Sequence, residues 1–301
     1  MTILTQRMRE ELARCNYAQT TIRTYLMAIE EFRRHADKRL DHLGPEDIRR
    51  YQVALLEDKK LAVGTVALRV SALRFFYLKV LKKRALKDEL PYPKNPKWAR
   101  RLPTILTPEE MARLIDSAKN LFHYAMLLTM YSAGLRRSEL CRLKVSNIDS
   151  PRMVIRVERG KGGVDREIPL SPKLLETLRT YWRWMRPKTY LFPGTENGWR
   201  ADKPITPKVV WEAVQEAALR AGITKHVTPH TLRHCFATHL LEAGTDLRTI
   251  QILMGHRDIE ATARYLQVST QHLKAAVNPI EQISVSGPAR LRRSRRLHKP
   301  E

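Results

Sequence analysis

Four of the pairs in which serine or threonine precedes proline constrain the fold of this chain more than any other feature. They are Thr107-Pro108, Ser171-Pro172, Thr206-Pro207 and Thr228-Pro229. A serine or threonine side chain accepts a hydrogen bond from the first turn of a helix, and proline suits the first helical position because no N–H is needed there. Each pair therefore predicts the start of a helix, and the region from residue 107 is predicted to be mostly helical.

The same region contains two predicted strands. Met153–Val157 and Arg166–Leu170 flank a glycine-rich segment at 160–163, as in a β-hairpin. An apolar helix is expected from about residue 121 to 132, and Gly222 and Gly244 are expected to follow the C-terminal ends of two helices. The chain is therefore expected to be mainly α with a small β-sheet.

Residues 1–86 are predicted to form a separate helical domain. Apolar side chains recur there at the spacing of one helical face, at Val66, Val70, Leu73, Tyr77 and Val80. This pattern is typical of a packed helical core.

The remaining boundaries follow from composition. Residues 87–106 contain four prolines and several basic residues, which predicts an extended basic linker between two domains. The second domain is predicted to span 107–280. Residues 281–301 are basic and poor in apolar side chains, and are predicted to be disordered.

The charge indicates a polyanionic partner. The chain has 55 Lys and Arg against 31 Asp and Glu, a net charge of +24, and a sequence pI of about 10.3. Such a positive field attracts nucleic acid, with strong salt dependence. A protein of the ribosome or of a membrane surface is an alternative on charge alone.

Cysteine usage and hydropathy exclude several classes. Cys15, Cys141 and Cys235 are far apart and lack the spacing of a zinc site or a disulfide framework, which favours a reducing compartment. The sequence contains no run of 18 apolar residues, so no membrane span is predicted. The charged N-terminus does not resemble a signal peptide. We therefore expect a cytoplasmic protein, nucleoid-associated when it binds DNA, with no membrane partner.

A set of scattered polar residues is suited to chemistry on a phosphodiester. It comprises Arg136, Lys161, His230, Arg233, His256 and Tyr265. Guanidinium groups bind phosphate oxygens, imidazoles and ammonium groups move protons, and an activated tyrosine is a nucleophile. Each residue taken alone also has an ordinary explanation: a surface Arg–Glu pair, an exposed turn lysine or a core tyrosine.

Taken together, the motifs resemble a known family. The ordered series AGLRRSEL, RGKGG, HTLRH, LMGH and ARYL is similar to that of tyrosine recombinases, or phage integrases, especially short Xer-like members. The resemblance extends from the first helices to about residue 280. It implies an N-terminal helical core-binding (SAM-like) domain followed by a mixed α+β catalytic domain.

The resemblance also implies a role for each residue. Tyr265 corresponds to the nucleophile that forms a 3′-phosphotyrosyl link, and Arg136 and Arg233 to the pair that neutralises the nonbridging oxygens. Lys161 corresponds to the general acid for the 5′ oxygen and His230 to the proton acceptor of the tyrosine. His256 and Glu139 correspond to a transition-state donor and to a residue that supports the arginine. The chemistry implied uses no metal, no ATP and no cofactor.

The implied partner is double-stranded DNA, bound by a homotetramer on two sites. Basic residues expected to contact DNA are Arg69, Arg74, Lys82, Lys83, Arg84, Lys97, Arg100 and Arg101. A helix near Gln271–Val277 is expected to dock on a neighbouring protomer, with packing in cis as the alternative. A related recombinase or a directionality factor is a further candidate partner.

Three other functions stay open at this stage. One is a DNA-binding accessory factor that does not cleave, another is a topoisomerase-like relaxing enzyme, and the third is an RNA-binding scaffold. The sequence does not distinguish chromosome resolution from prophage integration or transposition, and it does not reveal the target site.

Overall fold

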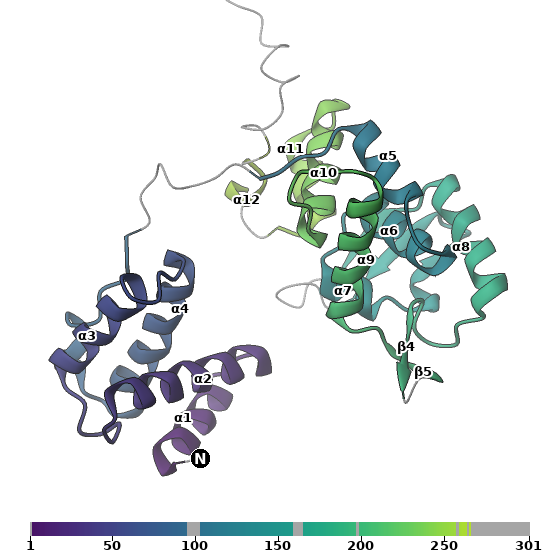
Figure 1. Ribbon diagram of the computed structural model, residues 1–301. Coiled ribbons are helices and arrows are strands. Elements are labelled where there is room, and N and C mark those ends of the chain that lie inside the picture. The colour runs from purple at the N-terminus through teal and green to yellow at the C-terminus, as the bar shows by residue number, and fades with distance from the viewer. Residues whose placement is uncertain are drawn as a thin grey trace, which may run out of the picture. The chain divides into compact units, whose positions relative to one another are not determined.

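A computed structural model describes residues 2–94, 103–158, 165–196, 199–256, 259–263 and 265. It divides into two compact units, Met1–Arg101 and Leu102–Glu301. Both are mostly helical, as the sequence predicts (Figure 1). No helix among these residues is long and apolar enough to cross a membrane.

Unit 1 is a bundle of helices around one apolar core. Its helices are α1 (Ile3–Arg14), α2 (Gln19–Ala36), α3 (Pro45–Leu56) and α4 (Val63–Arg74), followed by a π-helical turn (Phe75–Val80) and a 3₁₀ turn (Arg84–Lys87). The apolar series predicted from Val66 to Val80 is buried in this core, which also includes Leu90. The continuation of α4 into a wider helical turn keeps Phe75, Phe76 and Tyr77 inside.

Unit 2 combines helices with two small antiparallel sheets. The helices are α5 (Pro108–Asp116), α6 (Leu121–Ser132), α7 (Arg137–Arg142), α8 (Pro172–Met185), α9 (Pro207–Arg220), α10 (Pro229–Glu242), α11 (Leu247–Met254) and α12 (Glu260–Ala263). The strands are β1 (Ile148–Asp149), β2 (Val154–Val157) and β3 (Arg166–Pro169), in the order β1-β2-β3, and β4 (Pro193–Glu196) paired with β5 (Trp199–Pro204).

The four hydroxyl–proline pairs begin α5, α8, α9 and α10, as predicted. Thr107 and Glu110 form the capping box of α5. Gly222 and Gly244 have positive φ angles directly after the C-caps of α9 and α10, a conformation that glycine adopts without steric cost. Local sequence therefore determines these helix boundaries.

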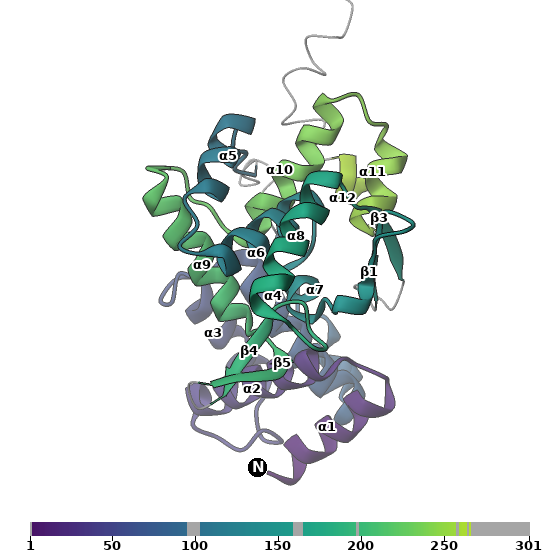
Figure 2. The same ribbon diagram turned by 90° about the vertical axis from the view of Figure 1, so that its right-hand side faces the viewer.

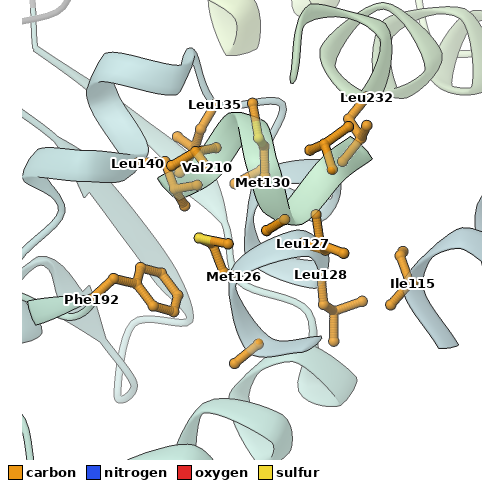
Figure 3. Packing of buried hydrophobic residues seen from close by; sticks show 14 of the residues in the cluster. Ile115, Met126, Leu127, Leu128, Met130, Leu135, Leu140, Phe192, Val210 and Leu232 are labelled. Atoms are coloured by element: carbon orange, nitrogen blue, oxygen red, sulfur yellow. The ribbon is translucent and has the colours of Figure 1, made fainter. Parts of the chain in front are cut away.

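The core of unit 2 surrounds α6. This helix is apolar on all sides, and its residues from Ala125 to Met130 are buried. Figure 3 shows its Met and Leu side chains between Phe192, Val210 and Leu232. A helix without a polar face must be enclosed by other elements, which here include α8, α9 and α10.

The hairpin predicted from the sequence is present as β2 and β3. Ile155 pairs with Ile168, and Val157 pairs with Arg166. β3 also contacts α11, and Figure 2 shows β3 beside that helix. The β4–β5 hairpin was not predicted, because Pro193, Gly194 and Pro204 are residues typical of turns. Gly194 is needed there, since a Cβ would lie 2.9 Å from the carbonyl oxygen of Pro204.

Helix α10 is fixed to the chain segment that enters unit 2. The amide of Leu106 donates to Sγ of Cys235 (3.2 Å), and its carbonyl accepts from Nε2 of His239 (2.9 Å). Nδ1 of His239 lies 2.8 Å from the hydroxyl of Tyr131 on α6. Cys235 and His239 thus hold in place the helix that presents His230 and Arg233.

Candidate active site

The predicted site residues lie at the ends of helices of unit 2. Arg136 is the N-cap of α7, His230 and Arg233 are on the first turns of α10, and His256 follows α11. Tyr265 follows α12 and is 1% exposed. Lys161 lies outside the described residues.

Glu139 orients Arg136 through both its backbone and its side chain. The carboxylate accepts from the Arg136 amide (2.8 Å) and from Nη1 of its guanidinium (2.7 Å). This is the capping geometry expected three residues into a helix. Burial of Glu139 opposes ionisation, but Arg166 and Arg136 outweigh it and lower the pKa of Glu139 to about 2. The carboxylate of Glu139 therefore remains ionised at any physiological pH.

Arg233 is buried beneath the site, with 4% of its side chain exposed. Its Nη1 donates to the carbonyl of Gly134 (2.6 Å), and its Nη2 donates to the carbonyl of Met254. Nη2 also lies 3.2 Å from Nε2 of His256. Burial and then the nearby Arg136 lower the pKa of Arg233 to about 9, so the guanidinium still carries its charge at pH 7. The two arginines predicted to bind phosphate are thus brought to one place.

The end of α11 supplies acceptors for these arginines. Helices end with unpaired carbonyl groups and a partial negative charge, both of which favour cations. Arg136 donates through Nη2 to the carbonyl of Gly255 (3.0 Å), the next residue after the carbonyl bound by Arg233. The chain then turns at Gly255, with φ +58°, and leads directly to His256.

Tyr265 packs between two imidazoles. Its ring stacks on that of His256, with centroids 6.3 Å apart and an interplanar angle of 16°. Its hydroxyl lies 3.1 Å from Nδ1 of His234. His256 is itself oriented by Thr262, whose hydroxyl is 2.9 Å from its Nδ1. The nucleophile candidate is therefore next to the arginine cluster and covered from solvent.

His230 is exposed on the first turn of α10. Desolvation of its ring, followed by the positive charges of Arg233, Arg137 and Arg136, lowers its pKa below the ordinary 6.5. A lowered pKa keeps the imidazole neutral at pH 7. The neutral form is the one that accepts a proton.

Sequence reasoning missed Arg166 and the position of His234. Arg166 is buried and binds Glu139 with both Nη1 (3.0 Å) and Nη2 (2.8 Å). A signal was available, since Arg166 shares the inward side of the predicted strand with Ile168, and a charge at such a position needs a partner. No local pattern in the sequence indicates that His234 meets Tyr265.

Some basic residues predicted to contact DNA are engaged within unit 1. Arg69 pairs with Glu31 at 2.9 Å. Arg74 donates to the carbonyls of Leu90 (2.7 Å) and Lys87 (3.1 Å). Lys97, Arg100 and Arg101 lie outside the described residues, as does the segment 271–277 predicted to dock on a neighbour.

Paired arginines beside a covered tyrosine, in a two-unit helical chain, define the class of tyrosine-based DNA strand-transfer enzymes. Residues 104–272 match the model of the phage integrase family, and residues 4–86 match that of a phage integrase N-terminal SAM-like domain. The chain belongs to the phage integrase family and is a site-specific tyrosine recombinase. The resemblance predicted from the motifs, including its short Xer-like character, is confirmed.

Individual relatives agree with this assignment. A putative integrase/recombinase of Sinorhizobium fredii is 47% identical over 289 residues, which cover 96% of this chain and 92% of the relative. The tyrosine recombinase XerA of Pyrococcus horikoshii is 38% identical over 232 residues, covering 77% of this chain and 79% of the relative.

Solved structures support the predicted fold. A crystal structure of XerA recombinase has a TM-score of 0.53 and 28% identity, and covers 94% of this chain and 99% of that one. A lambda integrase dimer bound to a core site has a TM-score of 0.69, covers 87% of this chain and 97% of that one, and is 20% identical, which shows a shared fold. The predicted combination of a SAM-like domain and a recombinase catalytic domain is confirmed.

Proposed function

We propose that this recombinase cuts and rejoins double-stranded DNA through a covalent link between Tyr265 and a 3′ phosphate. The observation that supports this most directly is the convergence of Arg136, Arg233 and His256 beside Tyr265, four residues drawn from the ends of separate helices. Such a cluster stabilises the charge that develops on the nonbridging oxygens of a phosphodiester.

In the proposed cleavage step, the Tyr265 oxygen attacks phosphorus and the bond to the 5′ oxygen breaks. The phenolic proton passes to His230, whose lowered pKa keeps it neutral and able to accept. Lys161 protonates the departing 5′ oxygen. Attack by a 5′-hydroxyl on the phosphotyrosine reverses the step and rejoins a strand. Because the phosphotyrosine conserves the bond energy, neither ATP nor a metal enters this scheme.

The buried position of Tyr265 implies that cleavage requires a movement. At 1% exposure the hydroxyl is inaccessible to a duplex, and it is held near His234. We propose that DNA binding displaces the segment after α11 and brings the hydroxyl to the phosphate. A tyrosine that is covered until DNA binds cannot attack a phosphodiester before the protein is bound at its site.

We further propose that the active form is a homotetramer on two DNA sites. A lambda integrase tetramer bound to a Holliday junction resembles this chain with a TM-score of 0.70. The net charge of +24 is suited to the close approach of two duplexes. Residues 271–277 are the proposed segment that docks on a neighbour, and a directionality factor is a further proposed partner.

A nicked duplex tests the proposed chemistry. It is built on the sequence that the protein selects from a random pool of duplexes, and the nick lets the cleaved strand diffuse away. We expect a protein–DNA adduct on a denaturing gel without divalent metal, and none with Tyr265→Phe. Tyr181→Phe is the matched control, because Tyr181 is also buried and donates from its hydroxyl to the carbonyl of Leu191 (2.8 Å).

The outcomes separate the alternatives. Binding without an adduct in wild type would support the non-cleaving DNA-binding factor. An adduct that persists in Tyr265→Phe would mean that another residue is the nucleophile.

A further inference from the structure

Arg166 is a buried cation to which the proposed reaction assigns no role. It begins β3, and 5% of its side chain is exposed. All of its guanidinium nitrogens are used: Nη1 and Nη2 bind the two oxygens of Glu139, and Nε donates to the carbonyl of Leu253 (2.8 Å). This bidentate arrangement is the geometry that arginine offers to a carboxylate.

Three arginines share one carboxylate at this position. Arg136 and Arg166 hydrogen-bond Glu139, and Nη1 of Arg233 lies 3.9 Å from its Oε2. The side chain of Glu139 is 5% exposed, so its charge must be neutralised by these neighbours and not by water. The cluster carries three positive charges against one negative charge, which leaves a net charge of +2 for a phosphate.

The same three arginines bind three successive carbonyl groups. Arg166 donates to the carbonyl of Leu253, Arg233 donates to that of Met254, and Arg136 donates to that of Gly255. A Cβ on Gly255 would lie 3.1 Å from Cδ of Arg166, so the Arg166 side chain packs tightly under this turn. Arg166 thus contacts both the carboxylate and the helix end that orient the two phosphate-binding arginines.

We propose that Arg166 is a positioning residue that keeps Glu139 from capturing Arg233. With Arg166 in place, both Glu139 oxygens are occupied, and Arg233 stays beyond hydrogen-bonding distance of the carboxylate. Without it, the buried carboxylate draws in Arg233, whose Nη1 already lies 3.9 Å from Oε2, and the scissile phosphate loses a partner. The inference rests on the proposed function, because it assigns Arg166 to the recombination reaction through Arg233.

The first test compares single-turnover cleavage by Arg166→Gln and wild type at saturating nicked duplex, below the melting temperature of each. We expect Arg166→Gln to cleave about 100-fold more slowly, as when one preorganised charge donor is lost, while binding DNA with unchanged affinity. Arg152→Gln is the matched control. Arg152 also makes a bidentate contact with a glutamate, Glu167 (2.9 Å each), but the pair is exposed, and we expect normal cleavage.

Two readouts distinguish positioning from a general loss of structure. In a methylphosphonate duplex one charged nonbridging oxygen is replaced, so the displaced Arg233 matters less and the defect of Arg166→Gln should shrink to a few-fold. Adding Glu139→Gln removes the carboxylate that captures Arg233. Because Glu139→Gln also weakens the hold on the Arg136 guanidinium, the recovery should be partial, and the double variant should cleave the ordinary duplex measurably faster than Arg166→Gln alone.

Each outcome decides the proposal. The proposal would be overturned by equal defects of Arg166→Gln on the two duplexes. It would also be overturned by a double variant that cleaves no faster than Arg166→Gln, or by a normal rate in Arg166→Gln. If Arg166→Gln does not fold, Arg166→Lys, with and without Glu139→Gln, is tested for the same order of rates. A wild type that forms no adduct would instead overturn the proposed function, which separates the two failures.

Discussion

Replacing Glu139 by glutamine tests how much the charge cluster stabilises unit 2. The carboxylate is buried and accepts hydrogen bonds from Arg136 and Arg166 through both of its oxygens. Glutamine keeps the size of the side chain but removes its charge and turns one acceptor into a donor. The neighbouring guanidinium groups then lie buried with no anion between them, which is costly.

The magnitude follows from the pKa of Glu139. The folded protein lowers it from the ordinary 4.5 to about 2, and each pH unit of difference is worth about 1.4 kcal/mol. The charged carboxylate therefore contributes about 3 kcal/mol to the free energy of unfolding at pH 7. Because the folded pKa is the lower one, this contribution is fully present above pH 4.5 and declines as the pH falls toward 2. About half of it remains at pH 3.

Urea unfolding followed by tryptophan fluorescence measures this effect. Four of the five tryptophans lie between residues 182 and 211, so the signal reports mainly on unit 2. We expect Glu139→Gln to lower the free energy of unfolding by about 3 kcal/mol at pH 7. The difference from wild type should fall to about half at pH 3, since wild type loses its own carboxylate charge.

Glu167→Gln is the control for this experiment. Glu167 is also bound by an arginine that lowers its pKa, but the pair is exposed and screened by water, and we expect an unchanged midpoint. The reasoning would be refuted by a loss below about 1 kcal/mol for Glu139→Gln at pH 7, or by a difference from wild type that does not decrease on acidification.

Three further predictions concern the surroundings of the site. Gly134→Ala should destabilise the protein by about 3 kcal/mol or more in thermal unfolding, because its φ is +53° and a Cβ would lie 2.3 Å from a phenylalanine ring of α10. Gly222→Ala, with φ +64° but open space around it, should cost only about 1 kcal/mol. Native protein should react with a maleimide at Cys15 alone, since the other two thiols are buried and burial raises the pKa of Cys235 to about 11; mass spectrometry before and after unfolding counts the labels. The loss of cleavage rate on acidification should begin at a lower pH than for a histidine of ordinary pKa, because burial and the nearby arginines lower the pKa of His230; a rate that falls already at pH 7 would contradict that role.

Local signals in the sequence were sufficient for most of the helices. A hydroxyl residue before proline and a glycine after the last turn act within a few residues, so Thr228 and Gly244 bound α10 regardless of what packs around it. The β2–β3 hairpin is local in the same sense. The β4–β5 hairpin was missed because its prolines and Gly194 are explained only by the close approach of the two strands.

The motifs predicted which residues form the candidate site, but not the contacts between residues that are far apart in the sequence. Arg136 and Glu139 are three residues apart, so their pairing follows from helix geometry. Arg166 is 27 residues from Glu139 and 87 from Leu253 in the sequence, and His234 is 31 from Tyr265. No short-range periodicity connects residues at such separations.

The sequence by itself determined that this chain has two helical units, that the second has a basic and histidine-containing set of residues at its helix ends, and that the set belongs to a tyrosine recombinase. Helix caps, hydrophobic periodicity and the individual motifs each depend on residues that are only a few positions apart in the chain. Only the tertiary structure decided that the end of α11 receives three arginines and that Glu139 is shared between Arg136 and Arg166. It also decided that Tyr265 is covered beside His234. The physical reason is that a buried charge or hydroxyl finds its partner through the packing of distant elements, and that packing is set by the whole core.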